Sequence, residues 1–186
     1  MSPLSVPQVL TWRPEALTQV ADEWDAAASR LQAQADTVDG AKTIGTAGVF
    51  TGSAANAARD AIGPTGTGLR RACQALILAA AEARNAADVI GAGRQRVLTV
   101  LAEARDDGCP VADDGTVGLP AGPSPLLVLC SGGSDAVARE MLDVRAGELT
   151  RRLQVALGEL GAADAAAASA IDAAFGAASP EPAAVR

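Results

Sequence analysis

Apolar residues recur every three or four positions along most of the chain, and this spacing places them on one face of a helix. Within residues 14–44 the stripe includes Leu17, Trp24 and Leu31, which follow one another at every seventh position. Pro14 suits the first turn of a helix, and two glycines follow the last turn. We therefore predict a long helix over 14–44. We take its candidate interaction seam to be Trp12, Leu17, Trp24 and Leu31.

The most regular repeat lies in residues 69–107. Apolar residues occupy every seventh position there: Leu69, Leu76, Ala83, Ile90, Val97 and Ala104. A helix of that length needs a neighbour, so we expect it to pack along the first helix as an antiparallel hairpin. A shorter helix is predicted from Ser53, and Pro64 in the stretch GPTGTG predicts a kink or break between the two.

A third long helix is predicted from Ser134, as its N-cap, to about Phe175. Its stripe consists of Val137, Met141, Val144, Leu149, Leu153, Ala156, Leu160, Ala163, Ala167, Ala170 and Ala174. The step from 144 to 149 breaks the alternation of three and four residues. We therefore expect a local phase slip at that point.

Two short helical segments are also predicted from their first residues. Ser5 and Gln8 have the spacing of a capping box, which predicts one helical turn over 5–10. The serine and proline at 124 and 125 are typical of a helix start, which predicts a helix over 124–130.

The segment between the second and third long helices differs in composition from the rest and lacks the helical spacing of apolar residues. Asp114-Gly115 lies between short apolar flanks, which predicts a small β-hairpin near 109–119. The fold class expected from all these patterns is all-α: an elongated bundle of three to four long helices, with an antiparallel hairpin as its core. We expect one helical domain over 1–178 and a flexible tail or linker over 179–186.

The composition agrees with a helical chain and argues against nucleic acid as a partner. Hydrophobic residues make up 49% of the sequence and aromatic residues only 2%, so the apolar content is mainly aliphatic. Alanine and leucine favour helices over strands. The net charge is −7, whereas binding to phosphates needs a clustered positive surface.

The absence of histidine and tyrosine excludes most catalytic arrangements. Neither a Ser-His-Asp nor a Cys-His site can form within such a chain, so we expect no enzyme and no cofactor. The three cysteines, Cys73, Cys109 and Cys130, lack the paired spacing of zinc ligands, so no metal site is expected. Buried free thiols are the default interpretation, and a Cys109–Cys130 disulfide is the alternative.

Three segments resemble the WxG superfamily of helical-hairpin proteins that actinobacterial type VII (ESX) secretion handles. WRPEALTQVADEWDAAASRLQAQAD (12–36) is similar to the first helix of such proteins, and FTGSAANAARDAI (50–62) is similar to their W-x-G turn and second-helix start. LAEARDDGCPVADDGTVGLP (101–120), followed by a further helix, is similar to longer members with a DDG-type ribbon. The resemblance covers residues 5–175.

The resemblance implies a role for the hairpin-tip motif Phe50, Thr51 and Gly52. Phe50 stands where the family has tryptophan, and Gly52 stands where it has the motif glycine. In the family this pair contributes to a composite surface that the secretion machinery reads. The other half of that surface is usually Y-x-x-x-D/E, which a chain without tyrosine cannot supply. Two alternatives stay open for Phe50: it faces outward to a reader, or it plugs the end of the bundle.

The hypothesis that follows is a non-catalytic, type VII secretion-associated WxG-like protein or targeting module. It would pair its helices with a protein partner of the WxG or toxin-associated kind, as a heterodimer or homodimer. The alternative is a cytoplasmic helical chaperone or immunity-type partner of a secreted toxin, whose acidic surface would suit a basic client. No conventional signal peptide and no membrane span are visible, so we expect a cytoplasmic protein, with type VII export as the other outcome.

Overall fold

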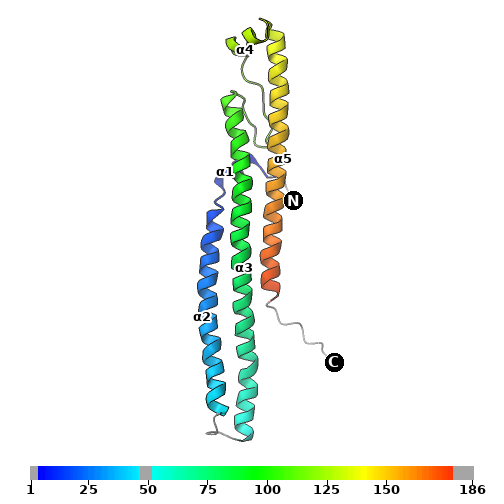
Figure 1. The fold of residues 1–186 in the computed structure, drawn as a ribbon. Coiled ribbons are helices and arrows are strands. Elements are labelled where there is room, and N and C mark those ends of the chain that lie inside the picture. The colour runs from blue at the N-terminus through cyan, green and yellow to red at the C-terminus, as the bar shows by residue number, and fades with distance from the viewer. Residues whose placement is uncertain (1–3, 47–51, 178–186) are drawn as a thin grey trace, which may run out of the picture. The chain divides into compact units, whose positions relative to one another are not determined.

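The computed structural model describes residues 4–46 and 52–177, which are mostly helical (Figure 1). The elements are α1 (Val6–Thr11), α2 (Glu15–Thr46), α3 (Ser53–Asp106), α4 (Pro125–Cys130) and α5 (Asp135–Gly176). No strand occurs within the described ranges. The all-α class expected from the sequence is confirmed.

The chain divides into two compact units. Unit 1 consists of Met1–Pro14 and Asp88–Ala165, and unit 2 consists of Glu15–Ala87 and Ala166–Arg186. α3 and α5 contribute residues to both units, whereas α1 and α4 belong to unit 1 and α2 to unit 2. Where the sequence predicts one domain over 1–178, the structure separates two units. The predicted tail over 179–186 lies outside the described residues.

In unit 2, α2 runs antiparallel to the N-terminal part of α3 (Figure 1). Arg84 donates to Asp22 at 2.7 Å and to Asp25 at 2.6 Å. Cys73, which precedes Arg84 in α3, donates its thiol proton to the carbonyl of Ala28, which follows both aspartates in α2. The two helices therefore pair in opposite directions, as the predicted hairpin requires.

The contact between these two helices is built mainly from alanine. Ala21, Ala28 and Ala35 occupy every seventh position of α2, and all three are buried. The buried hydrophobic residues that the structure describes in the unit 2 part of α3 are Ala55, Cys73, Ala75, Ala79, Ala80, Ala83, Ala86 and Ala87. Alanine buries little apolar area per residue, so the stabilisation is spread thinly along the whole helix pair.

α3 continues without a break through Pro64, so of the predicted kink or break the break is wrong, while the kink stays a prediction. Proline removes the bond to the carbonyl of Asp60, four residues earlier, but both residues are exposed and water can satisfy that carbonyl. The Thr67 hydroxyl also donates to the Gly63 carbonyl at 3.3 Å. Burial of alanines farther along the helix stabilises it enough to offset the lost bond.

In unit 1, the C-terminal part of α3 runs antiparallel to the N-terminal part of α5 (Figure 1). Arg152 donates to both carboxylate oxygens of Glu103, at 2.6 and 2.7 Å. Arg145 donates to Glu103 at 3.2 Å and to Asp107 at 2.8 Å. The largest fully buried side chains of unit 1 are Val9, Val97, Leu149, Leu153 and Leu160.

Hydrogen bonds near both ends of α1 hold this helix against α3 and the loop before α4. Arg94 of α3 donates to the carbonyl of Val9 at 3.1 Å and to that of Leu10 at 3.3 Å. The backbone N–H of Val6 donates to the carbonyl of Asp113 at 2.8 Å, which ties the start of α1 to the loop before α4. These bonds satisfy backbone groups that a short helix leaves unpaired at its ends.

The helix starts agree with the sequence signals. Ser124 accepts the backbone N–H of Leu127 at the start of α4, and Ser134 accepts that of Val137 at the start of α5. At α1, the Gln8 side chain accepts the backbone N–H of Ser5 at 2.9 Å. The short helices predicted over 5–10 and 124–130 and the long helix from Ser134 are therefore confirmed.

The predicted β-hairpin near 109–119 does not form two strands. Only an isolated antiparallel bridge joins Val111 and Val117. The two bonds around this bridge form, from the Ala112 N–H to the Thr116 carbonyl and from the Gly118 N–H to the Pro110 carbonyl. The pairing does not extend, because Pro110 has no N–H to donate and the Thr116 N–H donates to the Asp114 carboxylate. Neighbouring elements use other backbone groups of this segment. Val117 donates its N–H to the Thr150 hydroxyl of α5, and the Asp113 carbonyl accepts from α1. Gly115 still adopts the left-handed conformation that the Asp-Gly turn signal implies, with φ of +84°.

The predicted stripe of α5 is wrong in its first turns. Val137, Met141 and Val144 are exposed, whereas Ala138 and Ala146 are buried. The inward positions run through 138, 142, 146, 149, 153, 156 and 160, which alternate steps of four and three residues after 142. No phase slip is required. The larger apolar side chains at the start of α5 therefore lie on an outer face.

Candidate protein-binding surfaces

The predicted hairpin-tip motif is described only at its last residue. Phe50 and Thr51 lie outside the described residues. Gly52 has φ of +136°, a conformation that residues with a Cβ atom rarely adopt. Its carbonyl accepts the N–H of Asn56 in the first turn of α3. Glycine therefore suits this position just before α3.

The predicted interaction seam is partly used inside the chain. Leu17, Trp24 and Leu31 are half-buried in α2, beside the fully buried alanines. The Trp24 ring meets Phe175 of α5 edge to face, with centroids 5.2 Å apart, within unit 2. Trp12 belongs to unit 1, where it is half-buried just after α1. Trp24 therefore contributes to packing within unit 2, and the role of these four residues as an interaction seam stays a prediction.

An exposed apolar surface lies instead on α4 and the first turns of α5, within unit 1. We define the outer apolar surface as Leu126, Leu129, Val137, Met141 and Val144. Leu126, Leu129 and Val144 expose 69%, 73% and 68% of their surface. Side chains of this size stabilise a fold when buried, so their exposure makes this surface a candidate for protein binding.

The charges beside the outer apolar surface are acidic. Glu140 and Asp143 lie between its members in α5, and neither forms an ion pair with a described residue. Asp135 is paired with Arg139, four residues later, at 3.0 Å. This apolar surface therefore has unpaired negative charge along one side.

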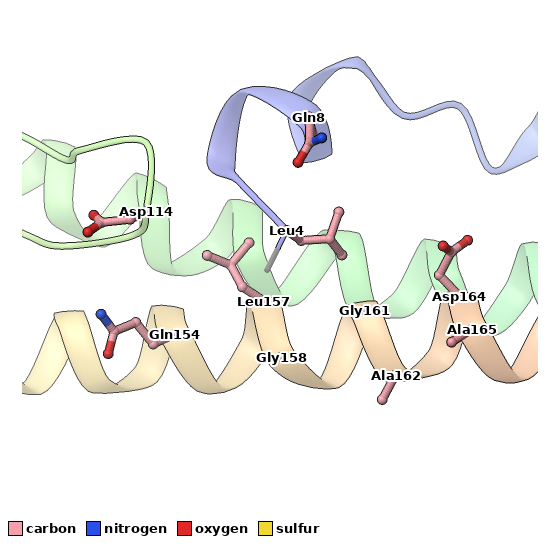
Figure 2. A pocket seen from close by; sticks show the side chains of 10 residues that line it. All are labelled: Leu4, Gln8, Asp114, Gln154, Leu157, Gly158, Gly161, Ala162, Asp164 and Ala165. Carbon is pink, nitrogen blue, oxygen red and sulfur yellow. The ribbon is translucent and has the colours of Figure 1, made fainter. Parts of the chain in front are cut away.

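A second feature of unit 1 is a groove between α1, the Asp114 loop and α5. It has a volume of about 710 Å³, and Figure 2 shows the residues that line it. They are Leu4, Gln8, Asp114, Gln154, Leu157, Gly158, Gly161, Ala162, Asp164 and Ala165. Glycine and alanine residues of α5 form the floor of the groove. The groove is open there because larger side chains would fill the same space.

The electrostatics of the groove are negative. Asp114 and Asp164 are its only charged lining residues, and neither forms an ion pair with a described residue. The backbone N–H of Thr116 donates to the Asp114 carboxylate at 2.9 Å and holds the pKa of that carboxyl below its usual value. Asp114 is therefore ionised at neutral pH and retains lone pairs for a further donor.

The cysteines form no disulfide in this structure. Cys73 and Cys109 are buried and Cys130 is exposed, and all three are free thiols. Burial and the nearby Asp107 carboxylate raise the pKa of the Cys109 thiol, which makes its thiolate scarce at neutral pH. The described residues contain no group of three or more metal-ligating side chains placed to bind an ion.

Two of the surfaces described above were not identified from the sequence. The sequence pattern places Val137, Met141 and Val144 of this surface on the inward stripe, since both faces of α5 carry apolar residues in helical spacing. The groove brings together Leu4, Asp114 and Asp164, which are far apart in the chain. The available signals were the Asp-Gly turn and the cluster of glycines and alanines in an otherwise regular helix.

None of the described helices combines the length and the apolar character needed to cross a membrane. The chain matches no family model, no curated protein and no solved structure.

Proposed function

We propose that this chain is a non-catalytic interaction module that pairs with a helix of a partner protein through the outer apolar surface. The exposure of Leu126, Leu129, Val137, Met141 and Val144 is the observation that carries this proposal. Val137, Met141 and Val144 recur at i, i+4 and i+7 along α5, the spacing of anchors on a helix face that an amphipathic partner helix covers. Burying each of the larger ones adds roughly 1–2 kcal/mol of binding free energy before ordering costs.

The setting we propose for this pairing is type VII secretion. The support is the resemblance of residues 12–36, 50–62 and 101–120 to WxG-type proteins, in which helical hairpins associate with partner chains. The antiparallel pair formed by α2 and α3 is compatible with such a hairpin. Because the chain has no tyrosine, the partner would supply the Y-x-x-x-D/E half of the export signal.

The pairing is tested by co-expression with the products of the genes that flank its own. We expect one of them to form a stable complex on size exclusion with light scattering. The double change Met141→Glu and Val144→Glu should weaken this complex at least about tenfold, because two carboxylates would be buried in an apolar contact. Val89→Glu is the matched control, since Val89 is an exposed valine of α3 in the same unit. Equal weakening by both changes would contradict the proposal.

The secretion setting has its own test. In a host with a working type VII system, the tagged chain should appear outside the cell only when its partner is present. Phe50→Ala should abolish export without lowering Tm if Phe50 faces a reader. A chain that remains in the cytosol while still binding its partner would favour the alternative role of a chaperone or immunity-type protein.

A further inference from the structure

We propose that the groove between α1, the Asp114 loop and α5 binds a second segment of a partner protein, one that carries basic side chains on both sides of an apolar one. The inference is drawn from the lining of the groove and its charge. It concerns a different surface from the outer apolar surface, so either proposal can fail without the other.

The apolar part of the groove is open and shaped by small residues. Figure 2 shows Leu4 and Leu157 between the two aspartates, above the stretch of α5 that contains Gly158 and Gly161. A Cβ added at Gly158 would meet no neighbouring atom within 4 Å. An apolar side chain of a partner can therefore enter at this point without moving the protein. The groove volume of about 710 Å³ lies in the range of pockets that hold ligands or several side chains.

The polar part of the groove selects for positive charge. Asp114 lies at one end of the labelled row in Figure 2 and Asp164 lies toward the other end. No lysine or arginine lines the groove, so both carboxylates are left to an external cation. Two side-chain amides, of Gln8 and Gln154, add hydrogen-bonding capacity near them.

The same charges distinguish a protein segment from other occupants. An anionic membrane surface or a phosphate would meet two uncompensated carboxylates and be repelled. A single small cation would satisfy one carboxylate and leave the apolar floor in water. Arginine side chains on either side of leucine or alanine satisfy the carboxylates and cover the apolar residues at once.

The probe that tests this is the capped peptide acetyl-RALALAAR-amide. Titration of the full chain, followed by the methyl resonances of Leu4 and Leu157, should give saturable shifts. The matched peptide QALALAAQ should bind about fivefold more weakly, because each exposed ion pair adds only a modest amount of binding free energy. EALALAAE should show no measurable binding. Raising the salt to about 0.5 M should bring RALALAAR close to QALALAAQ.

Two variants test the location. Gly158→Leu places a large side chain in the groove, at a position where an added Cβ meets no atom within 4 Å, and should abolish the shifts. Gly147→Leu, on the same helix and with equal space for a Cβ, should leave them unchanged. Asp164→Asn, at a side chain with no bond to a described residue, should lower RALALAAR affinity toward that of QALALAAQ. Asp143→Asn is its control.

The proposal is overturned if no peptide gives saturable shifts, or if all three bind alike. It is also overturned if Gly158→Leu keeps the Tm of the parent chain and still binds RALALAAR. Failure of the flanking-gene complex, with intact peptide binding here, would remove the proposed function and leave the groove as a site.

Discussion

At the residue scale, Glu103 of α3 links this helix to α5 in unit 1 by accepting hydrogen bonds from two arginines. It accepts two hydrogen bonds from Arg152 and one from Arg145, which itself also reaches Asp107. The bonds from Arg152 are the main cause that lowers the pKa of the Glu103 carboxyl. A lowered pKa in the folded chain means that this contact stabilises the fold above the unfolded pKa, and that the effect is lost as pH falls through the folded pKa.

Glu103→Gln should therefore destabilise the chain in a pH-dependent way. Near pH 7 we expect Tm to fall by about 2 °C, because the contact is partly exposed and screened by solvent. The difference from the parent chain should begin to shrink as pH falls below the ordinary glutamate pKa of about 4.3 and should vanish below the lowered folded pKa, where the folded parent also loses its charge. Thermal unfolding followed by circular dichroism across this pH range measures it. Glu140→Gln, which removes a carboxylate without an ion pair, should show no such trend.

Gly115 gives a second residue-scale prediction, based on conformation and space together. Its φ is +84°, and a Cβ there would lie 2.9 Å from Leu157 Cδ1 and 3.3 Å from Leu153 Cγ. Gly115→Ala should lower the free energy of unfolding by about 2 kcal/mol in urea titrations. Gly132→Ala is the control for strain alone, since Gly132 has φ of +72° and no neighbour within 4 Å. It should cost about 1 kcal/mol; equal losses would show that the packing against α5 is unimportant.

At the element scale, the chain signals where helices begin more clearly than which face they bury. Ser124 and Ser134 act as caps because their side chains bond nearby backbone N–H groups, which is a local effect. The rotation of α5 is not local: Arg145 must face Glu103 and Asp107 of α3, and this turns Val144 outward and Ala146 inward. Periodicity shows that a helix has an apolar face, but α5 has two.

The sequence does not predict the groove either, because the groove also depends on contacts between distant parts of the chain. Leu4 and Leu157 are recognisable as apolar residues, but their proximity follows from bonds made at a distance. The N–H of Val6 bonds to the Asp113 carbonyl, and Gly115 packs on Leu157, which together bring α1 and the loop onto α5. A single sequence contains no direct signal for such contacts. The Asp-Gly turn was recognisable, but its partners were not.

Pro64 provides the element-scale prediction. Because α3 is continuous, Pro64→Ala should restore a backbone bond to Asp60 and raise the free energy of unfolding by about 1–3 kcal/mol. Amide hydrogen exchange should slow in residues 53–63, which precede the proline. Gly68→Ala, at a position of α3 with no neighbour within 4 Å, serves as a reference and should add only about 0.5–1 kcal/mol. A loss of stability on Pro64→Ala would show that the helix is interrupted there in solution.

At the scale of the whole molecule, net charge and exposed apolar area act against each other. The chain carries a formal charge of −7, so two copies repel each other at low salt. The outer apolar surface would favour association of copies once that repulsion is screened. In a two-fold pairing of antiparallel α5 helices centred on Met141, Glu140 of one copy would lie near Asp143 of the other, which opposes a tight homodimer.

The chain alone should therefore be monomeric at about 0.05 M salt and associate weakly at about 0.5 M, where the Debye length is only a few ångströms. Sedimentation velocity over a concentration series measures this directly. Met141→Glu with Val144→Glu should remove the salt-induced association, because it adds charge to the face that would be buried. Val89→Glu should leave it largely intact. A stable dimer at low salt would mean that the acidic flank does not oppose self-pairing, and the partner through this surface would then be a second copy of the chain.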